Sequence, residues 1–232
     1  MSLTIAVIVG SLRQDSFNAR LADALATLAP DDIEFRRLRI DDLPLYNQDD
    51  DNSPPAPVKR LKEGIRQADG LLFVTPEYNR SIPGVLKNAL DHASRPYGDS
   101  AFPDKPAGII GVSIGAIGTA AAQQHLRTIL AYLDMPTLGQ PEAFLKADDV
   151  LDDNGGIAEG SRKFLQGWMD AYLDWVRRHA CPDATAPLPA PCRRRCLEAR
   201  AARPSRADSA RRWSSNSTGS STTNGTSSIA RW

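Results

Sequence analysis

Short apolar runs alternate with amphipathic segments along the first 180 residues of the chain. Residues 5–9 are continuously apolar, and a strand of this kind must be covered on both of its faces. Between such runs, apolar residues recur every three or four positions, which is the pattern of one buried helix face. Regular alternation of the two patterns predicts a parallel sheet flanked by helices. The expected strands are 3–9, 33–38, 70–75, 108–113 and 137–145.

Five helices are expected between and after these strands. Their apolar stripes are centred on residues 17–28, 58–65, 85–90, 126–133 and 165–176. Five strands fit either a truncated dinucleotide-binding fold or the flavodoxin-like order 2-1-3-4-5, and the number of strands does not choose between them. In both folds a ligand binds beyond the carboxyl ends of the strands, where the winding of the sheet reverses.

A change of composition near residue 180 predicts the end of the folded domain. Residues 181–232 contain only three residues from the Ile/Leu/Val/Phe/Met/Tyr set, too few to offset an ordering cost of about 1–2 kcal/mol per residue. We therefore predict a domain over residues 1–180 and a disordered tail over residues 181–232. Two alternatives for the tail are a nucleic-acid or anionic-surface patch at 193–195 and half of a metal site at Cys192 and Cys196.

The charge of the chain is balanced overall but not along its length. Residues 1–180 hold 19 Lys+Arg against 25 Asp+Glu, whereas residues 181–232 hold 9 against 3. All three cysteines lie after residue 180, so the domain has no disulfide, no thiolate nucleophile and no expected metal site. No apolar run approaches the roughly 20 residues that a membrane helix needs, and no signal-peptide pattern opens the chain. We expect a cytoplasmic protein with no membrane or nucleic-acid partner.

The first polar loop at the expected carboxyl edge runs over residues 10–18. A helix start offers unpaired N–H groups and a partial positive charge to an anion. Ser11 and Ser16 add hydroxyls, Arg13 a guanidinium and Asn18 an amide, which together predict a phosphate cradle. In the alternative, Ser16 merely caps the helix and Arg13 is solvated. Glycine spacing excludes a dinucleotide fingerprint, and the absence of a Gly-Lys-Ser/Thr triplet excludes a Walker loop.

The next two strands are followed by loops of similar character. Residues 75–84 form a polar, proline-stiffened loop that places Tyr78 and Asn79 where amides could hold the edge of a planar heterocycle. Its alternative is a tight turn with an exposed tyrosine. Residues 113–119 contain two glycines that permit close approach of a ligand to the backbone, the alternative being a flexible turn. Three such loops on one edge predict a ligand site there.

Two motifs in these loops carry a resemblance to a known family. The chain resembles the NADPH-dependent FMN reductase family of flavodoxin-like proteins, and in particular its bacterial quinone and chromate reductase branch, over residues 1–178. The resemblance implies a three-layer α/β sandwich of strand order 2-1-3-4-5. The motifs are Gly10-Ser11-Leu12-Arg13-x-x-Ser16-x-Asn18 and Thr75-Pro76-Glu77-Tyr78-Asn79-x-Ser81-x-Pro83-Gly84-x-Leu86-Lys87-Asn88-Ala89-x-Asp91, supported by Gly115-x-x-Gly118 and Gln124-His125-Leu126-Arg127.

The same resemblance implies where FMN binds. Its phosphate is expected in the first loop and its isoalloxazine edge against the second, with the third loop bordering the ring. No catalytic protein residue is implied, because the flavin carries the hydride chemistry. The chain departs from the family pattern at Thr119 and Ala120, where glycine or a small residue is expected. The implied FMN contacts are Ser11, Arg13, Ser16, Phe17, Asn18, Pro76, Glu77, Tyr78, Asn79, Ser113 and Gly115.

The implied activity is transfer of hydride from NAD(P)H through FMN to a quinone, flavin, azo compound or chromate, with ping-pong kinetics. A homodimer or homotetramer is implied as well, with Arg127 and Glu142 as candidate contacts across subunits. The alternatives are a flavodoxin-like electron carrier without NAD(P)H activity and a non-enzymatic module. Such a carrier is typically strongly acidic, whereas residues 1–180 carry a net charge of only −6. The acceptor and the choice between NADH and NADPH stay open.

Overall fold

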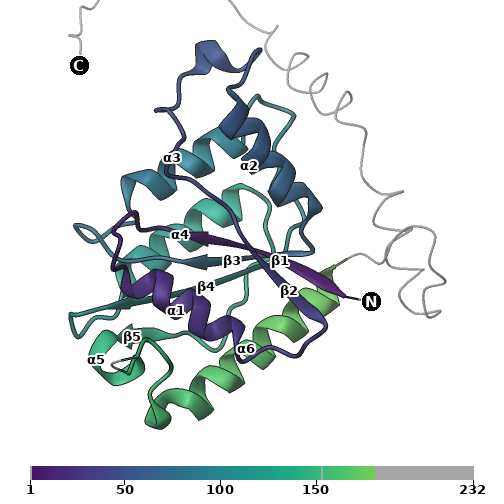
Figure 1. Cartoon of the computed structure of the whole chain (residues 1–232). Helices are drawn as coiled ribbons and strands as arrows, with labels where there is room; N and C mark the ends of the chain where they lie inside the picture. The colour runs from purple at the N-terminus through teal and green to yellow at the C-terminus, as the bar shows by residue number, and fades with distance from the viewer. Residues whose placement is uncertain (1, 153, 181–232) are drawn as a thin grey trace, which may run out of the picture. The chain divides into compact units, whose positions relative to one another are not determined.

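A computed structural model describes residues 2–152 and 154–180 of the chain (Figure 1). Five parallel strands form one sheet in the order β2-β1-β3-β4-β5. The flavodoxin-like order is therefore confirmed, and the truncated dinucleotide-binding fold is wrong. The predicted tail, with its two alternative sites, lies outside the described residues. None of the helices in the described part is long and apolar enough to cross a membrane.

The first four strands lie within one residue of the bounds that the sequence predicts. The fifth prediction, residues 137–145, is mostly wrong, because Thr137 forms only an isolated bridge to Ala107 and the strand begins at Phe144. Pro136 and Pro141 have no N–H to donate to a ladder, which explains the interruption. The strands are β1 (Leu3–Val9), β2 (Ile33–Arg37), β3 (Gly70–Val74), β4 (Ala107–Ser113) and β5 (Phe144–Lys146).

The five predicted helices are all present, and a short one that the periodicity did not indicate follows β5. The helix expected near Pro83 begins at Gly84, with the proline as its N-cap. The helices are α1 (Phe17–Ala26), α2 (Ala56–Gln67), α3 (Gly84–Ala93), α4 (Ala120–Tyr132), α5 (Ala147–Val150) and α6 (Glu159–His179), together with the 3₁₀ turn η1 (Gln48–Asp50).

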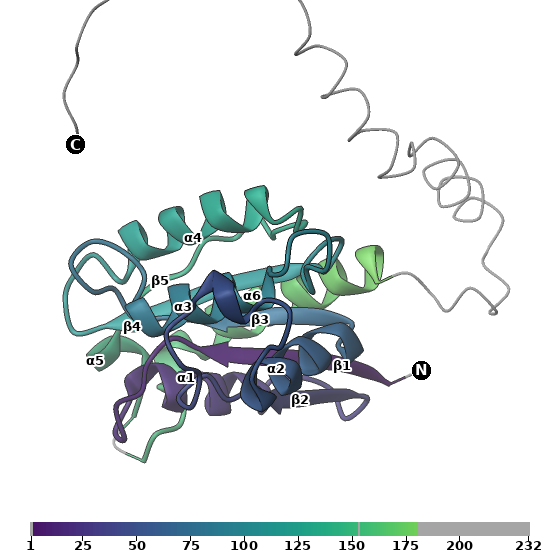
Figure 2. The same cartoon turned by 90° about the horizontal axis from the view of Figure 1, so that it is seen from above.

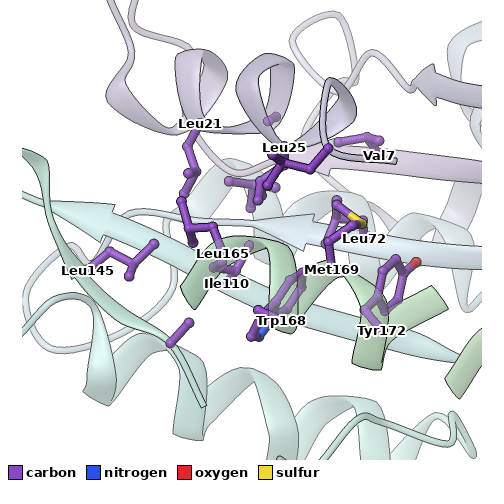
Figure 3. Packing of buried hydrophobic residues seen from close by; sticks show 14 of the residues in the cluster. Val7, Leu21, Leu25, Leu72, Ile110, Leu145, Leu165, Trp168, Met169 and Tyr172 are labelled. Carbon is purple, nitrogen blue, oxygen red and sulfur yellow. The ribbon is translucent and has the colours of Figure 1, made fainter. Parts of the chain in front are cut away.

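Helices cover both faces of the sheet (Figures 1 and 2). Successive side chains of a strand point to opposite faces, so Val7 joins the core under α1 and α6, while Ala6 and Ile8 join the core under α2, α3 and α4. Figure 3 shows the first of these cores, in which Leu21 and Leu25 of α1 meet the buried face of α6. The three-layer arrangement leaves the carboxyl edge of the sheet to the loops.

An aromatic pair on α6 fills the centre of the first core (Figure 3). Trp168 and Tyr172 stack with ring centroids 5.6 Å apart, and both are buried. Tyr172 lies so close to β4 that a Cβ on Gly108 would be 2.6 Å from its ring. Within the described residues, the Tyr172 hydroxyl and the Trp168 Nε1 have no hydrogen-bond partner. Burial raises the pKa of Tyr172 well above its usual value, so its hydroxyl stays protonated.

Replacing Tyr172 with phenylalanine should stabilise the protein. The substitution removes a buried hydroxyl without a partner, which costs the folded state about 1–3 kcal/mol. We expect the free energy of unfolding, measured by urea denaturation, to rise by about 1 kcal/mol. Tyr132→Phe is the control, because that side chain is 81% exposed and its loss should change little. A drop in stability for Tyr172→Phe would show that the hydroxyl is satisfied after all.

Candidate functional site

The loops that follow β1, β3 and β4 leave one edge of the sheet side by side. These strands are neighbours, and their ladder continues into the loops through the bonds Gly10 N to Val74 O (2.9 Å) and Thr75 N to Ile110 O (3.0 Å). The approach is tight, because a Cβ on Gly10 would be 2.6 Å from the Thr75 hydroxyl. The structure therefore brings together the three loops in which the sequence predicted the site.

The first loop ends at the start of α1, where the N–H groups of Phe17 and Asn18 have no acceptor among the described residues. Ser16 is the N-cap, as the simpler alternative had it, and its hydroxyl accepts from Ala19 N at 3.3 Å. The N–H groups of Phe17 and Asn18 belong to the first two helical positions, which have no partner within a helix. Ser11, at the start of the loop, is half-buried, and its hydroxyl accepts from Arg13 N at 3.4 Å. The cap thus leaves donors free for an anion.

Two arginines flank the ring of Phe17 at this helix start. The guanidinium carbon of Arg13 lies 5.7 Å from the ring centroid, and that of Arg20 lies 5.9 Å away, within the range of cation–π attraction. Arg20 also donates to Asp152 O at 2.8 Å. Among the described residues, neither guanidinium has a carboxylate within 4.0 Å. The sequence analysis missed Arg20, although its position one turn after Phe17 placed it on the same helix face.

Asn18 is buried and ties α1 to β4. Its Nδ2 donates to Val112 O at 2.9 Å, and its Oδ1 accepts from Val112 N at 3.1 Å. The carbonyl of Ile110 still accepts from the backbone of Thr75. Two residues further along β4, Val112 bonds to the Asn18 side chain instead, because the chain after β3 has turned away into the second loop. The amide therefore replaces a strand at the end of the ladder. The second N–H group of Nδ2 has no acceptor among the described residues.

The second loop contains a type I′ turn. Tyr78 and Ser81 exchange two backbone bonds of 3.0 Å, and the central residues Asn79 and Arg80 have φ values of 51° and 65°. The tight turn with an exposed tyrosine, which was the alternative for this loop, is thus present. The backbone N–H groups of Glu77 and Asn79 have no acceptor among the described residues. Pro76 is buried, and the open N–H groups lie beyond it on the loop.

The side chain of Glu77 reaches across to the start of α4. Its Oε2 accepts from the N–H groups of Ala121 (2.9 Å) and Ala122 (3.2 Å), while Oε1 lies 3.2 Å from Arg80 Nη1. Thr119, the N-cap residue, makes no capping bond of its own. The N–H groups of the flanking residues bond to backbone carbonyls of the third loop. The first N–H groups of α4 therefore all have acceptors, so this helix start is closed to a ligand. The start of α1 is open in the sense that Phe17 N and Asn18 N have no acceptor among the described residues.

The third loop explains the departure from the family pattern. Thr119 has a φ of 71°, a left-handed conformation that favours glycine, so a glycine expectation there is physically reasonable. The threonine is buried, and its hydroxyl accepts from Gln123 Nε2 at 3.0 Å. Gly118 is also left-handed, and a Cβ there would be 2.4 Å from the backbone of Phe144. Ser113 donates to the carbonyl of the exposed Gly115 at 3.0 Å.

Each loop also exposes at least one large apolar side chain. Leu12, Tyr78 and Ile114 are 54%, 50% and 72% exposed. Open helix N–H groups, guanidinium groups, free backbone donors and apolar side chains are the groups that a flat, phosphorylated heterocycle requires. The residues present therefore fit FMN.

Residues outside these loops make structural contacts. His92 bonds to Pro44 O at 2.9 Å, and His179 bonds to Trp175 O at 2.8 Å. Arg127 Nε lies 3.7 Å from Glu142 Oε1 within the same chain. The pair is an ion pair within one chain, and Arg127 Nε has no hydrogen-bond partner among the described residues.

A doubly wound sheet of order 2-1-3-4-5, with the start of α1 at its switch point, defines a flavodoxin-like α/β protein. Residues 3–149 match the model of the NADPH-dependent FMN reductase family, and the chain belongs to that family. The predicted family is confirmed. The predicted class of enzyme, an oxidoreductase that uses FMN and NAD(P)H, is confirmed with it.

Characterised relatives and one solved structure extend this result. The chain is 58% identical to a 2-hydroxy-1,4-benzoquinone reductase of Burkholderia sp, over 76% of this chain and 98% of the relative. It is 41% identical to a quinone reductase of Escherichia coli (strain K12), over 76% of this chain and 96% of the relative. The structure of FerB, a flavoenzyme NAD(P)H:(acceptor) oxidoreductase from Paracoccus denitrificans, is 45% identical with a TM-score of 0.72, over 76% and 98% of the two chains.

Proposed function

We propose that the three loops bind FMN and that this chain reduces quinones with NAD(P)H. Bound FMN would supply the hydride chemistry, accepting hydride from the nicotinamide and passing it to the quinone. The observation that carries the proposal is the open start of α1 beside the free N–H groups of the second loop. Both lie on one edge of the sheet, at its switch point.

The start of α1 is the better place for the phosphate. Ser11 and Ser16 supply hydroxyls, Phe17 and Asn18 supply N–H groups, and Arg13 supplies charge. A helix start contributes typically 0.3–1 kcal/mol to anion binding, and a hydrogen bond to a charged group about 1.5–3 kcal/mol. The start of α4 offers neither, because the Glu77 carboxylate occupies it and would repel a phosphate.

The second and third loops are placed to hold the ring. The free N–H groups of Glu77 and Asn79 can donate to acceptors along the ring edge, and Tyr78 is half exposed beside them. Pro76 stiffens the start of this loop, while Ser113 and Gly115 border the site on the other side. These residues orient the ring and leave one face to the two substrates. No protein nucleophile is required.

Quinone is the acceptor class that the surface favours. Leu12, Tyr78 and Ile114 give the mouth of the site an apolar character that suits a flat aromatic acceptor better than a metal oxyanion. The relatives named as quinone reductases support this choice. We also propose a cytoplasmic location, since reduced nicotinamides are supplied there. A homodimer or homotetramer is proposed from the family resemblance alone.

A colour test checks the proposal. The protein reconstituted with FMN and freed of excess flavin should be yellow, and NADPH added without oxygen should bleach the flavin band within one turnover. Benzoquinone should then restore the band. Free FMN at the same concentration is the control. A yellow protein that NADPH leaves yellow would be an electron carrier, and a protein that stays colourless after soaking with FMN would not be a flavoprotein.

A further inference from the structure

Glu77 connects two of the three loops through its side chain. Only 10% of this side chain is exposed, and its Oε2 accepts from two consecutive N–H groups of α4, those of Ala121 and Ala122. A helix normally takes such bonds from its own N-cap residue. Here the N-cap, Thr119, is left-handed and bonds to Gln123 instead. The cap of α4 is therefore supplied from a loop 44 residues earlier in the chain.

The turn next to Glu77 needs support. Arg80 is left-handed, a conformation that a residue with a Cβ adopts only at some cost. Two side-chain contacts hold this turn besides its own backbone bonds. One is the ion pair from Arg80 to Glu77 at 3.2 Å, and the other is the bond between Ser81 Oγ and His125 Nδ1 at 3.0 Å. His125 belongs to α4, and Glu77 is itself bonded to α4. Both contacts therefore connect the turn to that helix.

The third loop is held at its other end by Asn18. This side chain bonds to Val112 directly before the loop, and Glu77 bonds to Ala121, the second residue of α4 after the loop. Side chains of the first and second loops thus secure both ends of the third. The three loops form one braced unit.

We propose that Glu77 is a positioning residue, whose carboxylate sets the second loop against α4 so that the loop backbone meets the flavin in a fixed geometry. This inference rests on the proposed function, because it takes the second loop as the place of the ring. Both oxygens of the carboxylate are already engaged by α4 and Arg80. The flavin contact of this residue is then its free backbone N–H.

The test compares Glu77→Ala, Glu77→Gln and the control Glu63→Ala, which removes an exposed carboxylate of α2 that accepts a bond from Gln67 of the same helix. In FMN-free protein, Glu77→Ala should speed amide exchange at Ala121 and Ala122 about tenfold and weaken FMN binding by a similar factor. Glu77→Gln keeps an oxygen that can accept one of the two bonds, so its FMN affinity should stay within about threefold of the wild type. Glu63→Ala should match the wild type throughout.

Two outcomes overturn the proposal. If the Ala121 and Ala122 amides of Glu77→Ala exchange at the wild-type rate and this variant binds FMN as the wild type does, the Glu77 carboxylate does not position the loop. If Glu77→Gln loses FMN as fully as Glu77→Ala while the Ala121 and Ala122 amides stay protected, the carboxylate acts on the flavin directly. Should Glu77→Ala fail to fold, Glu77→Gln with fast exchange and retained affinity also contradicts the brace. Failure of the proposed function would give a different result. In that case the wild type itself would not bind FMN, although its Ala121 and Ala122 amides would remain protected.

Discussion

Replacing Gly111 with alanine is expected to destabilise the protein by about 3 kcal/mol, at the upper end of the usual cost of overpacking. A Cβ at this position would lie 2.1 Å from the Thr75 carbonyl oxygen and 2.4 Å from the Thr119 hydroxyl. The carbonyl belongs to a residue whose N–H is bonded to Ile110 O, so it cannot easily move aside. Since domains are stable by only about 5–15 kcal/mol, the loss is large.

Urea denaturation measures this effect, with Gly167→Ala as the matched control. Gly167 lies inside α6 with no atom within 4 Å of a new Cβ, so alanine there should stabilise by about 0.5–1 kcal/mol. The two glycine-to-alanine substitutions should therefore have opposite signs. A Gly111→Ala protein as stable as the wild type would mean that the second and third loops are not packed as closely as described.

Removing the Arg13 side chain has the second large effect, this time on cofactor binding. Arg13→Ala should weaken FMN binding by about 10- to 100-fold, because a charge-assisted hydrogen bond to phosphate contributes about 1.5–3 kcal/mol. The fold should persist, since the Arg13 side chain is exposed and lies against the ring of Phe17, while the bond to the Ser11 hydroxyl comes from the backbone N–H that alanine keeps. Flavin fluorescence titration gives the dissociation constants.

The contribution of the phosphate can be isolated with riboflavin, which lacks it. Binding of riboflavin should be nearly the same in Arg13→Ala and in the wild type, whereas binding of FMN should differ. Arg177→Ala, which removes an exposed arginine from the last turn of α6, serves as the control for the loss of charge. Equal FMN affinity in Arg13→Ala and the wild type would remove Arg13 from the site.

The sheet and its helices could be predicted because each element carries its own periodicity. Apolar runs such as residues 70–74 are local signals, and the observed strand is buried at every position. The fifth strand was placed wrongly because only three of its residues join the ladder, and a run that short carries little pattern. The strand order came from the motifs, since periodicity indicates which elements exist and not which of them are neighbours.

The site was predicted as a set of loops, but its internal contacts were not. Asn18 and Glu77 were both expected to touch FMN, and each also bonds to backbone that lies 94 or 44 residues away in the chain. A sequence motif shows that an amide or a carboxylate is present, but the partner depends on how the strands assemble. The place of Arg20 beside Phe17 could have been inferred from helical spacing, but its bond to Asp152, which joins residues 132 positions apart, could not.

The contrast between the two helix starts gives the edge of the sheet a direction. Positive potential is concentrated beside β1, and the corresponding end beyond β4 is already neutralised by a carboxylate. A long ligand that is anionic at one end can then lie along this edge in one sense but not in the reverse one. We expect this difference in charge to set the direction in which such a ligand lies along the edge, before its aromatic part contacts the protein.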